Sequence, residues 1–260
     1  MRKKITIIGW GNMGAAIGEA LAEENWQVFF FDKDKSKLTS RKNITACPTL
    51  LEAVEKAKIL ILAIKPQDIP SFLKEAKKYL KDKLLISIAA GVSTKFFQKH
   101  LENTRVVRVM PNLAAKKRLS ISFISKGIKA SEKDLELACK IFSCVGDVIK
   151  IEENWLDKVT AISGSGPGYL YYLLHLFYKS AISLGFKKEL ARRMIKKTFL
   201  GATRLIEDSS LEFKEWFEKV ASRGGTTQAA VEEWRKNHLE EIIKKGIKRA
   251  VKRAQELNLK

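Results

Sequence analysis

The first 150 residues alternate short apolar runs with longer amphipathic stretches. This alternation is typical of βαβ units, which build a parallel sheet covered by helices. The predicted strands are 5–9, 28–31, 59–64, 84–88, 106–110, 121–124 and 148–151. The predicted helices between them are 13–24, 49–57, 67–80, 93–101 and 131–143. Ser131, followed three residues later by Asp134, is close to a capping box and marks the start of the last of these helices.

The pattern changes from Asn154 onward, where no clear strand remains. Apolar residues recur there at helical spacing through 166–184, 187–208, 211–221, 225–236 and 238–256. We therefore predict an α/β protein with an N-terminal Rossmann-type, mostly parallel sheet in residues 1–152 and a C-terminal all-helical domain in residues 153–260. A helical domain joined without a linker suggests a cleft between the halves, a common place for a substrate.

A GxGxxG pattern, Gly9-Trp10-Gly11-Asn12-Met13-Gly14, directly follows the first predicted strand and opens the first helix. In this context the pattern is the fingerprint of a dinucleotide site. Gly9 permits the tight turn, Gly11 lets the backbone approach a pyrophosphate, and Gly14 lets helix and strand pack closely. The helix N-terminus offers unpaired N–H groups and a partial positive charge to the phosphates.

Asp32 ends the second predicted strand, where an acidic side chain usually accepts hydrogen bonds from the adenosine ribose and repels a 2′-phosphate. Lys33 and Lys35 follow it and offer charges that such a phosphate would pair with, or are solvated loop charges. Both NADH and NADPH remain open as cofactors, and Asp32 favours NADH.

Composition adds one strong feature, a formal charge of +20. A field of this size attracts phosphates, including those of nucleic acid. The basic residues are nevertheless spread over polar helix positions, which favours a lysine-rich solvated surface without a nucleic-acid partner. Examples are Lys74, Lys77, Lys78, Lys81, Lys83, Lys244, Lys245, Lys248, Arg249, Lys252 and Arg253.

The remaining composition excludes several classes of protein. No apolar run is long enough for a membrane span, and the N-terminus lacks the pattern of a secretory signal, so we expect a cytoplasmic protein. Three cysteines and three scattered histidines give no spacing for a metal site. Cys139 and Cys144 lie in an apolar stretch and are expected to be small core residues.

Five further segments resemble pyrroline-5-carboxylate reductases, in the order in which that family has them. They are Ala63-Ile64-Lys65-Pro66-Gln67, Ser87-Ile88-Ala89-Ala90-Gly91-Val92, Arg108-Val109-Met110-Pro111-Asn112, Thr160-Ala161-Ile162-Ser163-Gly164-Ser165-Gly166-Pro167-Gly168-Tyr169 and Ser222-Arg223-Gly224-Gly225-Thr226-Thr227. With the fingerprint, the resemblance covers residues 5 to about 230. It implies an oxidoreductase of proline biosynthesis that transfers hydride from NAD(P)H to a small cyclic imino acid.

The first three segments lie just beyond predicted strand ends, on the side of a parallel sheet where ligands bind. We therefore add to the cofactor site Ala63, Lys65, Pro66, Ala89, Ala90, Gly91, Pro111 and Asn112. Small residues there would let the nicotinamide ribose lie against the backbone. A turn with an Asn cap explains Pro111 and Asn112 almost as well.

The last two segments are the predicted substrate site. Ser163 and Ser165 alternate with glycines, which suits the close approach of a flat ring, although a tight helix crossing also explains the glycines. Gly224 and Gly225 expose backbone N–H groups at the start of a helix, a ready site for a carboxylate, and the N–H groups from Gly225 through Thr226 to Thr227 are expected to hold it. The resemblance implies that this loop holds the substrate carboxylate, that Thr227 hydrogen-bonds the ring nitrogen as the catalytic residue, and that the helical half dimerises.

The chain departs from the family pattern in two places, both beside the proposed site. Leu113-Ala114-Ala115-Lys116-Lys117 follows Asn112 where the family usually has Thr-Pro and a glycine-containing loop, and Arg223 replaces a proline. Two rivals stay open, a β-hydroxyacid dehydrogenase or related imine reductase and a weakly active dinucleotide-binding regulator, the latter supported only by the altered loop after Asn112. A β-hydroxyacid dehydrogenase needs a lysine early in the helix that begins at Gly166, and none occurs before Lys179.

Overall fold

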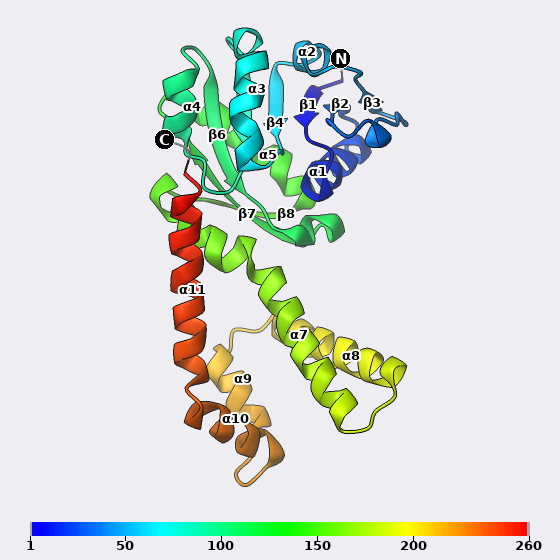
Figure 1. The fold of residues 1–260 in the computed structure, drawn as a ribbon, viewed down its shortest axis with the longest axis vertical. Coiled ribbons are helices and arrows are strands. Elements are labelled where there is room, and N and C mark those ends of the chain that lie inside the picture. The colour runs from blue at the N-terminus through cyan, green and yellow to red at the C-terminus, as the bar shows by residue number, and fades with distance from the viewer. Residues whose placement is uncertain (1, 259–260) are drawn as a thin grey trace. The chain divides into compact units, whose positions relative to one another are not determined.

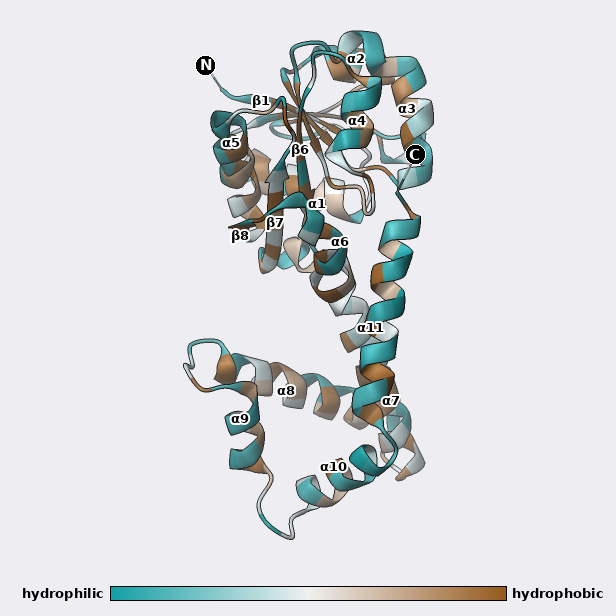
Figure 2. Ribbon diagram, turned by 90° about the vertical axis from the view of Figure 1, so that its left-hand side faces the viewer, coloured by the Kyte–Doolittle hydropathy of each residue, from teal (hydrophilic) through white to brown (hydrophobic). Residues whose placement is uncertain are grey.

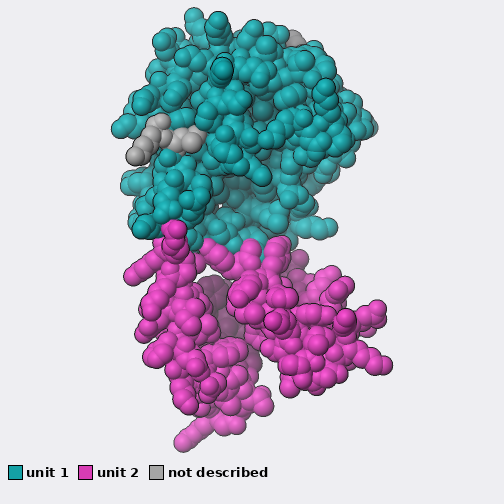
Figure 3. All heavy atoms as spheres, viewed as in Figure 1, with its two compact units in different colours: residues 1–167, 250–260 teal, residues 168–249 magenta. Residues whose placement is uncertain are grey.

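The computed structural model describes residues 2–258, which form two compact units (Figure 3). Of the described residues, unit 1 contains 2–167 and 250–258, and unit 2 contains 168–249. A compact unit need not be a segment that folds alone. The predicted domain boundary between residues 152 and 153 therefore stays a prediction. No helix within residues 2–258 is long and apolar enough to cross a membrane, and the cytoplasmic location stays a prediction.

Unit 1 is built on an eight-stranded sheet (Figure 1). The strands are β1 (Lys4–Ile8), β2 (Gln27–Phe31), β3 (Ile44–Ala46), β4 (Ile59–Leu62), β5 (Leu84–Ser87), β6 (Arg105–Met110), β7 (Ser120–Lys126) and β8 (Gly146–Lys150). Their order is β3-β2-β1-β4-β5-β6-β7-β8, and every neighbouring pair is parallel except β6 and β7. This confirms the predicted Rossmann-type sheet. The short strand β3 was not predicted.

Helices cover both faces of this sheet, as the strand sequences require. They are α1 (Asn12–Glu23), α2 (Leu50–Glu55), α3 (Ile69–Ala76), α4 (Thr94–His100) and α5 (Glu132–Phe142). In β4, Ile61 joins a core with α1 and α5, whereas Leu60 and Leu62 join a second core with α2, α3 and α4. Alternate strand residues point to opposite faces, so a strand buried on both sides is apolar throughout. The brown strands of Figure 2 show this directly.

Two local predictions in unit 1 can be compared with the structure. Ser131 and Asp134 form a capping box at the start of α5, as expected. Lys83, expected on the solvated surface, is instead buried, and its ammonium donates hydrogen bonds to the carbonyl oxygens of Val54 and Ala57 at 2.8 and 2.7 Å. Burial lowers the pKa of Lys83. The prediction was wrong because a polar residue just before a strand has no helix face to lie on.

A segment with irregular helical turns leads from the sheet into the second half. It contains α6 (Leu156–Val159) and a π-helical turn at Thr160–Gly164, after which α7 (Gly166–Ser183) begins. Arg108 of β6 is buried and donates to the Asp157 carboxylate at 2.7 Å, with Glu153 at 3.6 Å. This buried ion-pair cluster fixes the segment against the sheet.

Unit 2 is entirely helical within the described residues, which confirms the predicted class of this half. Its helices are the greater part of α7, α8 (Lys188–Ile206), α9 (Phe213–Val220), α10 (Thr226–Lys236) and the first part of α11 (Leu239–Glu256). Phe177 of α7 contacts Phe199 of α8 and Trp234 of α10 edge-on, at centroid distances of 5.0 and 6.1 Å. The buried core is small and centres on Ala181, Ala191 and Ile195.

Candidate functional site

The fingerprint folds as predicted, with Gly9 directly after β1 and Gly11 preceding the first residue of α1. Gly9 has φ +98°, which favours glycine, and a Cβ on Gly14 would lie 1.9 Å from the Gly9 carbonyl oxygen. The fold itself therefore requires these two glycines. Gly11 is different, because its φ of −82° suits any residue and a Cβ there would meet no protein atom within 4 Å. Its small size leaves open space over the helix N-terminus, where the pyrophosphate is predicted to lie.

A cavity of about 450 Å³ lies beside this turn, at the carboxyl ends of β1, β2 and β4. Six of the predicted cofactor residues line it, namely Gly9, Gly11, Asp32, Lys33, Ala63 and Lys65. Asp68 and Glu75 also line it and were not predicted, because no local motif marks either residue. The other predicted cofactor residues do not line this cavity.

Asp32 is buried at the wall of this cavity and binds the loops on either side of it. Its Oδ2 accepts a hydrogen bond from the Trp10 N–H at 2.6 Å, and its Oδ1 accepts one from the Asp34 N–H at 2.9 Å. The Lys37 ammonium lies 3.5 Å from Oδ1. The carboxylate therefore orders the glycine loop, and Oδ2, which has a single donor, keeps lone-pair capacity for a ribose hydroxyl.

The two predicted lysines after Asp32 differ in their surroundings. The Lys33 ammonium forms an ion pair with Oδ1 of Asp68 at 3.0 Å. Lys35 is exposed and has no ion pair within residues 2–258. Only Lys33 lines the cavity, so the two lysines are not equivalent.

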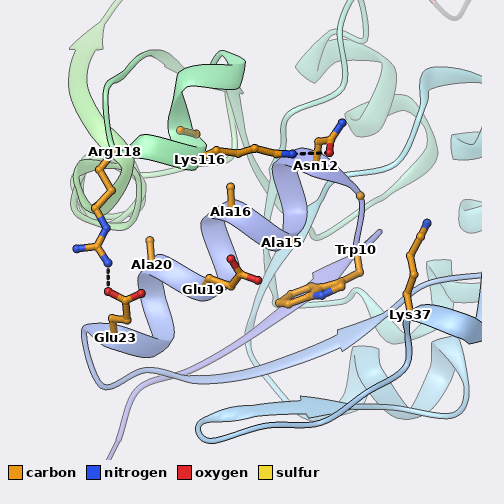
Figure 4. Close-up of a pocket in the computed structure, with 12 residues that line it drawn as sticks. Trp10, Asn12, Ala15, Ala16, Glu19, Ala20, Glu23, Lys37, Lys116 and Arg118 are labelled. Carbon is orange, nitrogen blue, oxygen red and sulfur yellow. Dashed lines mark hydrogen bonds and ion pairs between the residues drawn. The ribbon is translucent and has the colours of Figure 1, made fainter.

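A second cavity, of about 590 Å³, lies along the outer side of α1 (Figure 4). Trp10 and Asn12 line it, but the Trp10 ring stacks on Phe30 at 4.0 Å and belongs to the core. Lys116, in the segment that departs from the family pattern, donates to Oδ1 of Asn12 at 2.7 Å. Leu113–Lys117, the segment that departs from the family pattern, is thus a short helical turn hydrogen-bonded to the first residue of α1.

Of the predicted cofactor residues not yet placed, Met13 lies in α1, and the others lie in turns after β4, β5 and β6. Pro66 begins the helical turn after β4, and Asn112 caps the helical turn after β6 by accepting from the Ala114 N–H at 3.0 Å. Gly91 has φ +73°, and a Cβ there would lie 2.6 Å from the Ala254 carbonyl oxygen and 2.7 Å from Cβ of Leu257. Packing of the C-terminal residues, not space for a ribose, therefore explains this glycine, and its contact with a cofactor stays a prediction.

Ser163 of the predicted substrate site lies next to Asn112, whose side-chain amide donates to its hydroxyl at 3.3 Å. Ser163 and Ser165 belong to the π-helical turn and its C-terminal boundary and are half-buried. A Cβ on Gly164 would lie 3.2 Å from Sδ of Met110. Two segments predicted separately from the sequence are thus in contact within unit 1. Such π-helical turns occur frequently at functional sites.

The second part of the predicted substrate site lies in unit 2, at the start of α10. Gly224 has φ +73°, and its N–H donates to the Gln228 side chain at 2.7 Å. Gly225 is the cap residue of the helix, and its N–H donates to the Ser222 carbonyl. Within the described residues, the N–H groups of Thr226 and Thr227 have no acceptor, so this helix start is available to an anion. Arg223, which replaces the usual proline, is exposed.

No group of three or more metal-binding side chains occurs within residues 2–258. The geometry instead defines a Rossmann-type sheet with a glycine turn and a cavity at its carboxyl edge, the arrangement typical of dinucleotide-binding proteins, with a helical half attached. Comparisons with known proteins narrow this class. Residues 153–257 match the pyrroline-5-carboxylate reductase dimerisation family, and residues 4–91 match the NADP oxidoreductase coenzyme F420-dependent family.

Full-length relatives and structures agree with these matches. Pyrroline-5-carboxylate reductase 2 of Bacillus subtilis is 31% identical over 98% of this chain and 95% of its own. The structure of a pyrroline-5-carboxylate reductase from Coxiella burnetii superposes with a TM-score of 0.87 at 30% identity, covering 100% of both chains. A Plasmodium falciparum pyrroline carboxylate reductase, solved with NADP bound, shares the fold with a TM-score of 0.88 at 23% identity, over 98% of each chain. The chain belongs to the pyrroline-5-carboxylate reductase family.

Proposed function

We propose that this protein reduces Δ1-pyrroline-5-carboxylate to L-proline with hydride from a nicotinamide dinucleotide. The observation that carries this proposal is the open space at Gly11, in a chain whose sheet and helical halves both align with reductases of this family. The glycine turn and the neighbouring cavity are the proposed site of the dinucleotide, whose nicotinamide would supply the hydride. The rival activities are not favoured, because the full-length relatives are pyrroline-5-carboxylate reductases.

The start of α10 is the proposed site for the substrate. The unpaired N–H groups of Thr226 and Thr227, with the positive end of the helix dipole, suit the carboxylate of a cyclic imino acid. The Thr227 hydroxyl is the neutral group proposed to hydrogen-bond the ring nitrogen. Ser163 and Ser165 are proposed to line the substrate ring, with Asn112 fixing the Ser163 hydroxyl.

Orientation is the main contribution that the protein makes in this proposal. A protonated cyclic imine is already a strong electrophile, so the protein mainly has to hold the imine and the nicotinamide in the right relative position. Positioning of this kind supplies roughly 7–11 kcal/mol of a reaction barrier. Hydroxyl and backbone N–H groups therefore suffice for the proposed site.

We further propose that NADH is the preferred form of the cofactor. Asp32 is buried at the cavity wall, where its charge disfavours a 2′-phosphate. The Plasmodium protein carries NADP, but at 23% identity it is similar to this chain in fold alone.

A homodimer or larger assembly through the helical half is also proposed. Unit 2 has a small core, and its first helix exposes consecutive large apolar residues at 37–64% of their surface, namely Tyr169, Leu170, Tyr171, Tyr172 and Leu173. Exposed apolar patches of this extent mark interaction surfaces. The match to a dimerisation family over residues 153–257 supports the same conclusion.

The test is oxidation of NADH and of NADPH by the purified protein with pyrroline-5-carboxylate, alongside cyclic imino acids with one ring carbon fewer and one more. We expect turnover to be fastest with the five-membered ring and proline to accumulate in equal amount to oxidised cofactor. Cofactor binding without turnover on any imine would contradict the proposal and favour the regulatory alternative.

A further inference from the structure

A carboxylate in the dinucleotide cavity has no role in the proposal above. Asp68 ends the helical turn that follows β4, and its Oδ1 lies 3.0 Å from the Lys33 ammonium. The side chain is 32% exposed and lines the same cavity as Asp32. It precedes α3 but makes no side-chain capping hydrogen bond there. The fold therefore has no evident need for its charge.

Lys33 is the first cation after Asp32, where NADP-dependent Rossmann proteins place the positive residue that accepts a 2′-phosphate. In this chain the ammonium is already paired across the cavity with Asp68. The next cation of the cavity, Lys37, is shared between Asp32 and Asp34 at 3.5 Å each. Both cations near the ribose end thus have carboxylate partners within the protein.

We propose that Asp68 is a second determinant of cofactor specificity, which disfavours NADPH by holding Lys33 and adding a negative charge to the cavity. This inference rests on the proposed placement of the adenosine ribose beside Asp32. An ion pair this exposed contributes little to the stability of the fold. The ion pair instead affects cofactor binding. A 2′-phosphate must displace the Asp68 carboxylate from Lys33 and then remains close to that carboxylate, whereas a 2′-hydroxyl does neither.

The size of the effect follows from Coulomb's law. Two unit charges a few ångströms apart in water change a binding constant by roughly fivefold, and a 2′-phosphate carries more than one charge. Removal of the Asp68 charge also frees the Lys33 ammonium for the phosphate. We expect Asp68→Asn to raise the affinity for NADP⁺ relative to NAD⁺ by roughly five- to twentyfold.

The experiment measures binding of NADP⁺ and NAD⁺ by calorimetry, without substrate, together with adenosine 2′,5′-bisphosphate and adenosine 5′-monophosphate as half-cofactor probes. Because no imine is present, the result does not depend on which reaction the protein catalyses. Loss of turnover with intact binding would count against the proposed function alone. An unchanged NADP⁺-to-NAD⁺ ratio in Asp68→Asn would count against this inference alone.

Three variants make the test specific. Glu75→Gln removes another carboxylate of the same cavity that has no ion pair within the described residues, and it should change the ratio less than twofold. In a Lys33→Met background, Asp68→Asn should raise the ratio by less than it does in the wild type, because the freed ammonium is absent and only the loss of the carboxylate's repulsion remains. Asp68→Ser should repeat the effect of Asp68→Asn. An equal shift in Glu75→Gln, or a gain of the same size with and without Lys33, would overturn the proposal.

Discussion

The carboxylate of Asp32 accepts a hydrogen bond from the backbone N–H of Trp10, with 2.6 Å between the two atoms. Trp10 stands between the first two glycines of the fingerprint, so the residue expected to select the cofactor also shapes the loop that binds it. In the Rossmann fold the acid at this position hydrogen-bonds the ribose hydroxyl. Here, substitution of Asp32 is expected to change both specificity and stability.

For Asp32→Ala we expect the preference for NADH to narrow and the free energy of unfolding to fall by about 1–3 kcal/mol, because the buried Trp10 N–H loses its acceptor. Asp32→Asn keeps an acceptor oxygen, so it should also reduce the preference for NADH over NADPH but with a smaller loss of stability. Paired kcat/KM values for NADH and NADPH, with urea unfolding, separate the two effects. A strong preference for NADPH in the wild type would show that Lys33 and Lys35 dominate instead.

A second prediction concerns Gly11, where an added side chain meets open space. Gly11→Asp should fold normally and lose cofactor binding below detection by calorimetry, because its carboxylate would lie beside the pyrophosphate. Gly14→Ala is the contrasting variant, since its Cβ would lie 1.9 Å from the Gly9 carbonyl oxygen and the fold itself should fail. Unchanged cofactor affinity in a folded Gly11→Asp protein would remove the fingerprint argument.

The buried Arg108 gives a third prediction. Arg108→Met leaves the Asp157 and Glu153 carboxylates without their cation, and breaking a buried pair in this way costs about 3–5 kcal/mol of unfolding free energy. Combining it with Asp157→Leu should cost less than the sum of the two single variants, because fewer charges are left unpaired. Chemical denaturation of the four proteins measures this coupling. Strict additivity would show that the cluster does not act as a unit.

The fold followed from the sequence where periodicity was strong. Apolar strand runs and helical stretches located seven of the strands and the helices α7 to α11. The strand β3 escaped prediction because Ile44-Thr45-Ala46 is too short to show alternation, and only its pairing with β2 orders it. Lys83 was misplaced for a related reason, since its burial depends on the Val54 and Ala57 carbonyls, which are distant in sequence.

The candidate site could likewise be predicted only where its residues form a local motif in the sequence. Gly9, Gly11 and Asp32 form a local motif with a known geometry, and the structure places all three at one cavity. The Lys33–Asp68 pair joins residues 35 positions apart, and neither belongs to a pattern that names the other. The Gly91 turn shows the limit of local reasoning, because the atoms that exclude a side chain there come from Ala254 and Leu257.

The three thiols allow a prediction on pH. Burial raises the pKa of Cys144 from 9.0 to about 11 and also raises that of Cys47 and Cys139. At pH 8 only about one Cys144 in a thousand is a thiolate, so this half-buried thiol and the fully buried Cys47 should react slowly with iodoacetamide until the protein unfolds. The unfolded state releases these protons at a lower pH than the folded state. The unfolding free energy should therefore fall as pH rises from about 9 to 11. Rapid labelling of native protein at pH 8 would contradict the burial of these thiols.

The last prediction concerns Thr227, the residue proposed to contact the ring nitrogen. Thr227 is half-buried and Thr226 is exposed, although both stand in the first turn of α10. Thr227→Ala removes a hydroxyl and keeps the backbone N–H groups, and a hydrogen bond to a charged group is worth about 1.5–3 kcal/mol. We therefore expect kcat/KM to fall by roughly one to two decades, with cofactor affinity within about twofold of the wild type. Thr226→Ala should lower kcat/KM much less, because successive side chains on a helix point in different directions and that of Thr226 is exposed. Equal losses in both variants, or none in either, would make Thr227 a helix-start residue without a catalytic contact, and Ser163 or Ser165 would then be the next candidates for the polar contact to the imine.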